Sequence, residues 1–171
     1  MESENNGFTL IEILIVVAIV ALVGTMSAIA VNTARSKQRD ATRLSNVRLV
    51  QSALEDYFNE NNMYPEGDMI PLGDASVSAC LGLSGFAGDC SNDKAIIMNR
   101  VPRTFEDSLK SIVSCGQPTR SAFCFTQLKE GDGYVIHFEL ENGLPAAGLQ
   151  EGVNCATQDG MEAGTCVAKS K

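Results

Sequence analysis

A long apolar run near the start of the chain contains a single charged residue. This run extends from Phe8 to Val31, and its only ionisable side chain is that of Glu12. The part from Ile13 to Val31 is 19 residues long and carries no charge. Because a helix needs about 20 apolar residues to span a bilayer, this stretch is long enough to hold the chain in a membrane.

The next segment, residues 32–62, is charged and contains neither proline nor glycine. Its apolar residues recur at intervals of three and four, which places them on one face of a helix. These residues are Leu44, Val47, Val50, Leu54, Tyr57 and Phe58. The simplest interpretation is one helix from about Phe8 to about Asn59, followed by a break at Tyr64-Pro65, with Tyr64 packed back on the helix.

Alternating apolar and polar positions later in the chain predict β-strands. Residues 121–128 and 133–141 are rich in aromatic and β-branched side chains, and Lys129 to Asp132 supply turn chemistry, so they form a predicted hairpin. A short strand at 153–157 completes an antiparallel sheet, whereas residues 66–93 indicate a loop. In the second strand, the positions expected to face the helix are Tyr134, Ile136, Phe138 and Leu140. The predicted fold class is α+β, with a long N-terminal helix packed against a small antiparallel sheet.

Six cysteines lie in the C-terminal two thirds of the chain: Cys80, Cys90, Cys115, Cys124, Cys155 and Cys166. An even number in a small domain predicts disulfides and an oxidising compartment. Fifteen connectivities are possible for six cysteines. Spacings of 10, 9 and 11 favour pairing within successive pairs. A zinc site is disfavoured, because no two cysteines have C-x-x-C spacing and the single histidine is His137.

The residues around Glu12 resemble a known processing site. Gly7-Phe8-Thr9-Leu10-Ile11-Glu12, followed by the apolar run, resembles the N-terminus of type IV pilins and of the pseudopilins of type II secretion. In that family a membrane peptidase cuts after the glycine and methylates the new amine. The resemblance therefore implies cleavage between Gly7 and Phe8, N-methylation of Phe8, and an assembly role for Glu12. An acid in hydrocarbon needs a compensating cation, here the N-terminal amine of a neighbouring subunit.

The resemblance also implies an organisation of the whole chain. The expected parts are a leader at 1–7, a transmembrane or filament-core helix at 8–31, its amphipathic continuation at 32–62, and a disulfide-stapled head at 63–171.

A structural role follows from the resemblance. It implies a non-enzymatic pilin-like subunit that crosses the inner membrane once before assembly, with its head outside the cytoplasm. The prepilin peptidase, the membrane assembly machinery, lipid and further copies of the chain are its expected partners, in a cell-surface pilus or a periplasmic pseudopilus. A type II secretion pseudopilin and a minor or competence pilin remain alternatives. A membrane-anchored adhesin or DNA-binding surface protein is an alternative of another class.

The local net charge changes from positive to negative along the chain after the apolar run. A basic band follows the apolar run and consists of Arg35, Lys37, Arg39, Arg43 and Arg48. It is expected to meet lipid headgroups first and acidic surfaces of neighbouring subunits later. From Glu55 to Lys171 there are 8 basic and 17 acidic residues, which disfavours nucleic acid as a partner.

The charges flanking the apolar run predict the opposite orientation. Residues 1–6 contain no lysine or arginine, whereas the basic band follows the run, so the positive-inside tendency places the head in the cytoplasm. The cleavage motif and the cysteines favour a head outside it.

No catalytic motif is recognised, and no cofactor is expected. His137 is interpreted as an exposed or satisfied sheet residue. Some pseudopilins bind calcium in a C-terminal loop, so the resemblance leaves open a calcium site, although an EF-hand spacing is missing. Its candidate ligands are Asp132, Glu139, Glu141 and Asp159.

Overall fold

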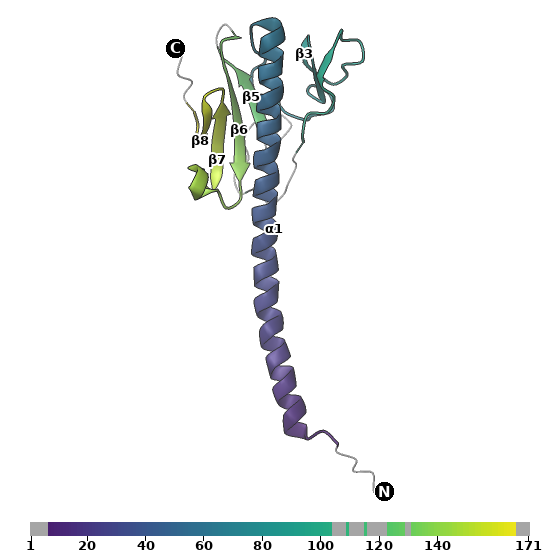
Figure 1. The fold of residues 1–171 in the computed structure, drawn as a ribbon, viewed down its shortest axis with the longest axis vertical. Coiled ribbons are helices and arrows are strands. Elements are labelled where there is room, and N and C mark those ends of the chain that lie inside the picture. The colour runs from purple at the N-terminus through teal and green to yellow at the C-terminus, as the bar shows by residue number, and fades with distance from the viewer. Residues whose placement is uncertain (1–6, 104–108, 110–114, 116–122, 129–130, 167–171) are drawn as a thin grey trace. The chain divides into compact units, whose positions relative to one another are not determined.

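The computed structural model describes residues 7–103, 109, 115, 123–128 and 131–166. The chain divides into two compact units, Met1–Gln38 and Arg39–Lys171. One α-helix, α1, spans Leu10–Asn61 and contributes to both units (Figure 1). Its bounds confirm the prediction of one long N-terminal helix and shift each predicted end by two residues.

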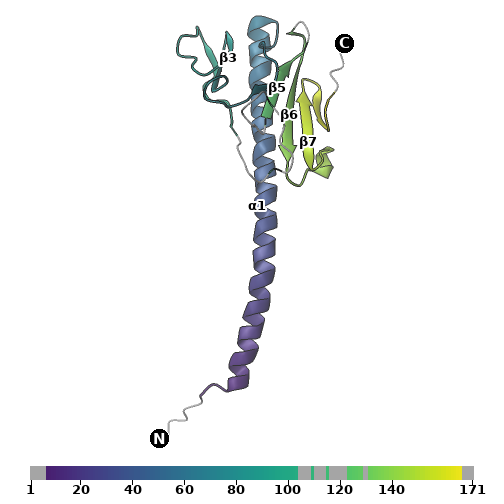
Figure 2. The same ribbon diagram turned by 180° about the vertical axis from the view of Figure 1, so that it is seen from behind.

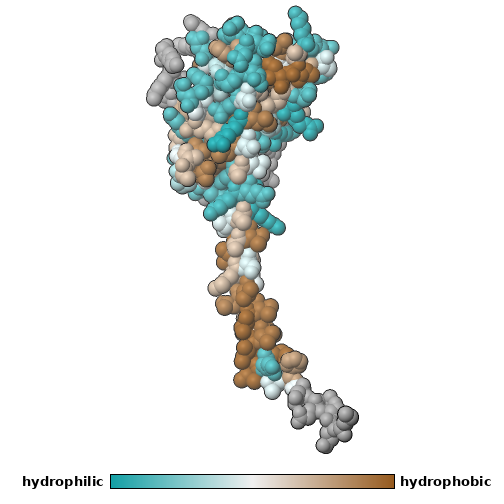
Figure 3. Space-filling view, in the orientation of Figure 1, coloured by the Kyte–Doolittle hydropathy of each residue, from teal (hydrophilic) through white to brown (hydrophobic). Residues whose placement is uncertain are grey.

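Within the first unit, α1 is uncharged and largely apolar from Ile13 to Val31. The large side chains of this stretch are all exposed, and Figure 3 shows them as an almost continuous hydrophobic surface. The few hydroxyls bond back to the helix itself: Thr25 Oγ1 donates to the Leu22 carbonyl and Ser27 Oγ to the Val23 carbonyl, each at 2.8 Å. Among the described residues, α1 is the one helix that is long and apolar enough to cross a membrane.

The second unit contains two antiparallel sheets beside the C-terminal half of α1. In chain order its strands are β1 (Ile70–Pro71), β2 (Cys80–Gly82), β3 (Gly85–Ala87), β4 (Ile96–Met98), β5 (Phe123–Gln127), β6 (Tyr134–Leu140), β7 (Gly152–Thr157) and β8 (Gly160–Ala163), and a short 3-10 helix, η2 (Pro145–Ala147), lies between β6 and β7. The larger sheet has the order β1-β5-β6-β7-β8, and the smaller has the order β3-β2-β4. Figures 1 and 2 show β3 on one side of α1 and β7 on the other.

The larger sheet confirms the predicted hairpin and the third strand. Phe125 of β5 pairs with Ile136 of β6, which in turn pairs with Ala156 of β7. Residues 129–130 of the predicted turn and 121–122 of the predicted strand lie outside the described residues, as do residues 1–6 of the predicted leader.

The smaller sheet corrects the prediction of a loop at 66–93. Its strands have three residues each, which is too short for a period of two to be recognised. Leu81 of β2 is fully buried, and a two-residue turn joins β2 to β3. Gly85, just after that turn, has a φ of 109°, which a residue with a Cβ rarely adopts.

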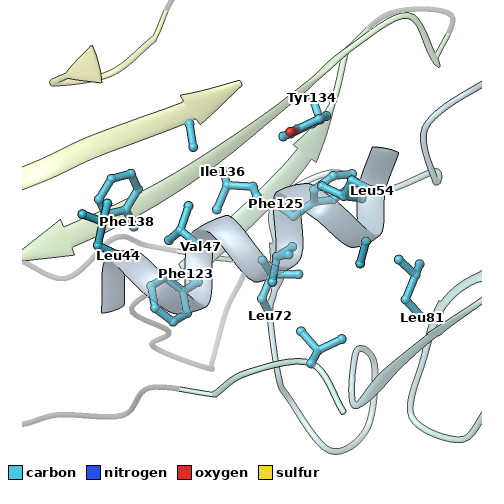
Figure 4. Packing of buried hydrophobic residues seen from close by; sticks show 14 of the residues in the cluster. Leu44, Val47, Leu54, Leu72, Leu81, Phe123, Phe125, Tyr134, Ile136 and Phe138 are labelled. Carbon is cyan, nitrogen blue, oxygen red and sulfur yellow. The ribbon is translucent and has the colours of Figure 1, made fainter. Parts of the chain in front are cut away.

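The core lies between α1 and the larger sheet. Figure 4 shows Leu44, Val47 and Leu54 of α1 beside side chains of β5 and β6. This arrangement confirms the predicted helix face and the inward set of β6, whose Tyr134, Ile136, Phe138 and Leu140 are all buried.

Tyr64 packs back on the helix end, as predicted. Its ring centroid lies 4.9 Å from that of Phe58 and 4.7 Å from that of Tyr134. The Tyr64 hydroxyl donates a hydrogen bond of 3.0 Å to the Glu55 carboxylate. Burial, and then the bond to Glu55, raise the pKa of Tyr64 well above its usual value. Asn62, with a φ of 56°, ends the helix in the left-handed conformation common just after a C-terminus.

Three disulfides staple the second unit. They join Cys80 with Cys90, Cys115 with Cys124, and Cys155 with Cys166, which are the pairs that the spacing favours. All six cysteines are therefore oxidised, and none is left as a thiolate for zinc. Each loop closure contributes about 2 to 3 kcal/mol by restricting the unfolded chain.

Candidate processing and assembly site

The helix start is defined by Thr9 and Glu12. The backbone N–H of Glu12 donates to Thr9 Oγ1 at 3.3 Å, and the N–H of Ile13 donates to the Thr9 carbonyl at 3.3 Å. Thr9 is thus the N-cap, and Glu12 occupies the third helical position, the spacing of a capping box. The helix dipole favours an acid in this first turn. The local sequence pattern Thr-x-x-Glu at positions 9–12 is the signal of this cap.

Gly7 and Phe8 precede the first helical residue and are exposed. The Phe8 side chain is 79% exposed. A Cβ built on Gly7 would meet no atom within 4 Å. The fold of this chain therefore does not require glycine at position 7, so a requirement for glycine there would come from an enzyme that cuts the peptide bond.

Glu12 has no cation nearby in the part of the chain that the structure describes. It is exposed among large apolar side chains, including those of Ile11 and Leu14, and the first basic residue after it is Arg35. A carboxylate in hydrocarbon without a cation is strongly disfavoured. If the apolar part of α1 is buried in an assembly, the compensating charge must come from another molecule.

Two residues of the basic band instead belong to a network inside the second unit. Arg39 Nε donates to Glu141 Oε1 at 2.7 Å, and Arg43 Nη2 donates to the same oxygen at 2.7 Å. Arg43 Nη1 donates to Asp40 Oδ1 at 2.8 Å. Asp40 also accepts hydrogen bonds from the backbone N–H groups of Glu141, at 2.7 Å, and Asn142, at 2.8 Å, and from Asn142 Nδ2 at 3.1 Å. We call these five residues the Asp40 network.

The basic band is not one continuous exposed surface, because two of its residues belong to the Asp40 network. Arg43 is only 1% exposed, and both it and Arg39 are bonded to the end of β6. Only Arg35, Lys37 and Arg48 of the band remain exposed. Sequence reasoning missed the network because Asp40 and Arg43 lie about a hundred residues from Glu141 along the chain, and local patterns do not report such contacts.

Replacing Arg43 with methionine should destabilise the second unit by about 3 kcal/mol, because removing one partner of a buried ion pair leaves Asp40 and Glu141 uncompensated. Arg48→Met is the matched control on the exposed side of the same helix and should change stability by less than about 0.5 kcal/mol. Denaturant unfolding of the full chain in detergent, followed by tyrosine fluorescence, measures both. Equal stability of the two variants would contradict an anchoring role for Arg43.

The four candidate calcium ligands do not come together. Asp132 precedes β6 and Glu141 follows it, and a strand of seven residues spans roughly 23 Å. Glu141 is bonded to Arg39 and Arg43, and Glu139 is buried. Within the described residues, no group of three or more His, Cys, Asp or Glu side chains is arranged to hold a metal ion. The structure therefore does not bring these four residues together into the calcium site that the resemblance left open.

His137 is a sheet residue. It lies in β6 between two disulfide cysteines, Cys124 of β5 and Cys155 of β7. The side chain is partly buried, and this burial lowers the pKa of His137 below its usual value. An imidazole in this position is neutral at pH 7.

Comparison with known families identifies the N-terminal segment. Residues 3–28 match the family model described as the prokaryotic N-terminal methylation motif. The match includes Gly7 and Phe8, which precede the helix, and Thr9 and Glu12, which define its start. No curated protein and no solved structure matches the chain.

Proposed function

Because the chain carries an N-terminal methylation motif, typical of type IV pilins and pseudopilins, on a long apolar helix, we propose that it is a structural subunit of a type IV pilus or a related filament. The observation that carries the proposal is the lone carboxylate of Glu12, set in the first turn of a helix whose apolar half is exposed on every side.

The apolar half of α1 must be removed from water. A helix that is apolar on all sides is stable only where lipid or other protein removes it from water. In the membrane, lipid covers it before assembly. In a filament, the same segments from further copies of the chain cover one another, and they associate by close packing rather than by a difference in hydrophobicity.

Processing prepares the chain for that assembly. In the proposal, the prepilin peptidase cuts between Gly7 and Phe8 and methylates the Phe8 amine, and the exposure of both residues ahead of the helix is compatible with access by an enzyme. The new terminal amine is a cation close to an apolar surface. Glu12 of one subunit would pair with this amine of its neighbour, so that both charges are compensated as the helices pack.

The second unit is the proposed head. Three disulfides indicate an oxidising compartment, so the head lies outside the cytoplasm, and the subunit crosses the inner membrane once before assembly. A type II secretion pseudopilus, which remains within the periplasm, would use the same processing and assembly sites. Recovery of the filament from the cell surface separates the two.

Intact mass tests the proposal. The protein is recovered from sheared surface material and from membranes and weighed with and without reduction. We expect a chain that begins at methylated Phe8, with all six thiols oxidised, in the sheared fraction. A chain that begins at Met1 with free thiols would contradict both the processing and the location.

A further inference from the structure

A groove lies between the last turns of α1 and the smaller sheet. Its volume is about 410 Å³. Asp56, Asn59 and Glu60 of α1 line one side, and Leu83, Ala95 and Ile97 line the other. The smaller sheet lies on the side of α1 opposite β7 in both views (Figures 1 and 2).

One wall of the groove is acidic and the other is apolar. Asp56 and Glu60 are four positions apart, so they lie on the same face of the helix, one turn from each other. Both are exposed, and in the described part of the chain neither takes part in an ion pair or a side-chain hydrogen bond. Like charges at this spacing destabilise a helix by a few tenths of a kcal/mol. Lys94, beside Ala95, makes no ion pair with them within the described residues.

The exposed cations on α1 complement this groove. Arg39 and Arg43 are bonded within the Asp40 network, whereas Arg35 and Lys37 are exposed and make no ion pair among the described residues. Arg35 lies one turn after Val31, which is 47% exposed, so the two share a face of the helix. This segment therefore presents an apolar side chain, which suits the apolar wall of the groove, next to a cationic side chain, which suits the acidic wall.

We propose that the groove receives side chains of the Val31–Arg35 segment of a second copy of the chain, with Arg35 facing Asp56 and Glu60, and Val31 facing Leu83 and Ile97. The inference rests on the proposed filament function, in which the helix of one subunit meets the head of another. Opposite charges at such a contact select the correct register and disfavour others. The groove then determines which head Arg35 reaches once it leaves the lipid headgroups.

Charge reversal tests the contact. Asp56→Lys with Glu60→Lys, and separately Arg35→Glu, should each lower the yield of sheared filaments about tenfold, because like charges then face each other. The chain with all three changes should recover to within about threefold of the wild-type yield, because the attraction is restored with its sign exchanged. Asp159→Lys with Glu162→Lys changes the same charge at exposed positions near the β7–β8 turn and should leave the yield unchanged.

Processing and folding are measured in every variant, by intact mass with and without reduction of the membrane fraction. If all variants are processed and oxidised but the triple variant assembles no better than the poorer of its two parents, the groove contact is overturned while the filament proposal stands. If the wild-type chain itself forms no filament, the proposed function fails first.

A second readout keeps the proposal testable if a charge-reversed chain does not fold. A photo-crosslinking phenylalanine analogue replaces Asn59, the uncharged residue of the acidic wall, in an otherwise wild-type chain. Crosslinks in sheared filaments from position 59 to a peptide that contains residues 31–35 of another copy support the contact. Crosslinks to other peptides alone overturn it.

Discussion

A chain with Gly7→Val should remain uncleaved and should form no filament. The substitution adds a β-branched side chain at the last residue before the expected cut. A Cβ at Gly7 meets no atom of this chain, so the fold itself is not disturbed. The effect arises in the peptidase, where a displacement of the reacting peptide bond by about 1 Å can slow cleavage about a hundredfold. Intact mass of the membrane-bound protein measures the N-terminus directly.

Gly24→Ala is the matched control for Gly7→Val. A Cβ at Gly24 also meets no atom within 4 Å, but this glycine lies within α1 and far from the expected cut. Its replacement should leave cleavage unchanged and should favour the helix by about 1 kcal/mol. If the Gly7→Val chain is recovered with Phe8 as its first residue, the cleavage site has been assigned to the wrong bond.

The long helix could be predicted from the sequence because its signals are local. A stretch of some fifty residues contains Gly24 as its only glycine and no proline. Its first part is uniformly apolar, and its second part shows helical periodicity. Asparagines followed by Tyr64-Pro65 mark its end. The β5–β6 hairpin is equally visible, because β6 alternates over seven residues. The smaller sheet could not be predicted, since strands of three residues carry no usable period and depend on tertiary burial of Leu81.

The candidate sites also divide into those that a local sequence pattern identifies and those that depend on tertiary contacts. Gly7, Phe8 and Glu12 fall within six residues, so a short motif is enough to identify them. The Asp40 network joins residues that are about a hundred positions apart, and the sequence showed Asp40 only as one acid within a basic segment. The groove at Asp56 and Glu60 depends on the smaller sheet, so it too could be recognised only from the structure.

Glu12→Ala should insert into the membrane and be cleaved as the wild type is, but filament yield should fall at least about tenfold. Insertion is not impaired, because removing a carboxylate from an apolar segment lowers the free energy of transfer into lipid. Assembly suffers, because the neighbour's terminal amine then lacks a counter-charge, and an uncompensated buried ion costs about 3 to 5 kcal/mol. Filament yield in the sheared fraction, normalised to processed chain in the membrane, measures the effect.

Glu12→Gln separates the proposed ion pair between subunits from a role of this side chain in capping the helix. Glutamine serves as well as glutamate at the third position of a capping box, so the helix start around Thr9 is preserved while the charge is lost. If pairing with the amine drives assembly, the glutamine variant should assemble as poorly as the alanine variant. Wild-type filament yield from Glu12→Gln, together with a loss in Glu12→Ala, would instead assign the residue to capping and would remove the proposed ion pair between subunits.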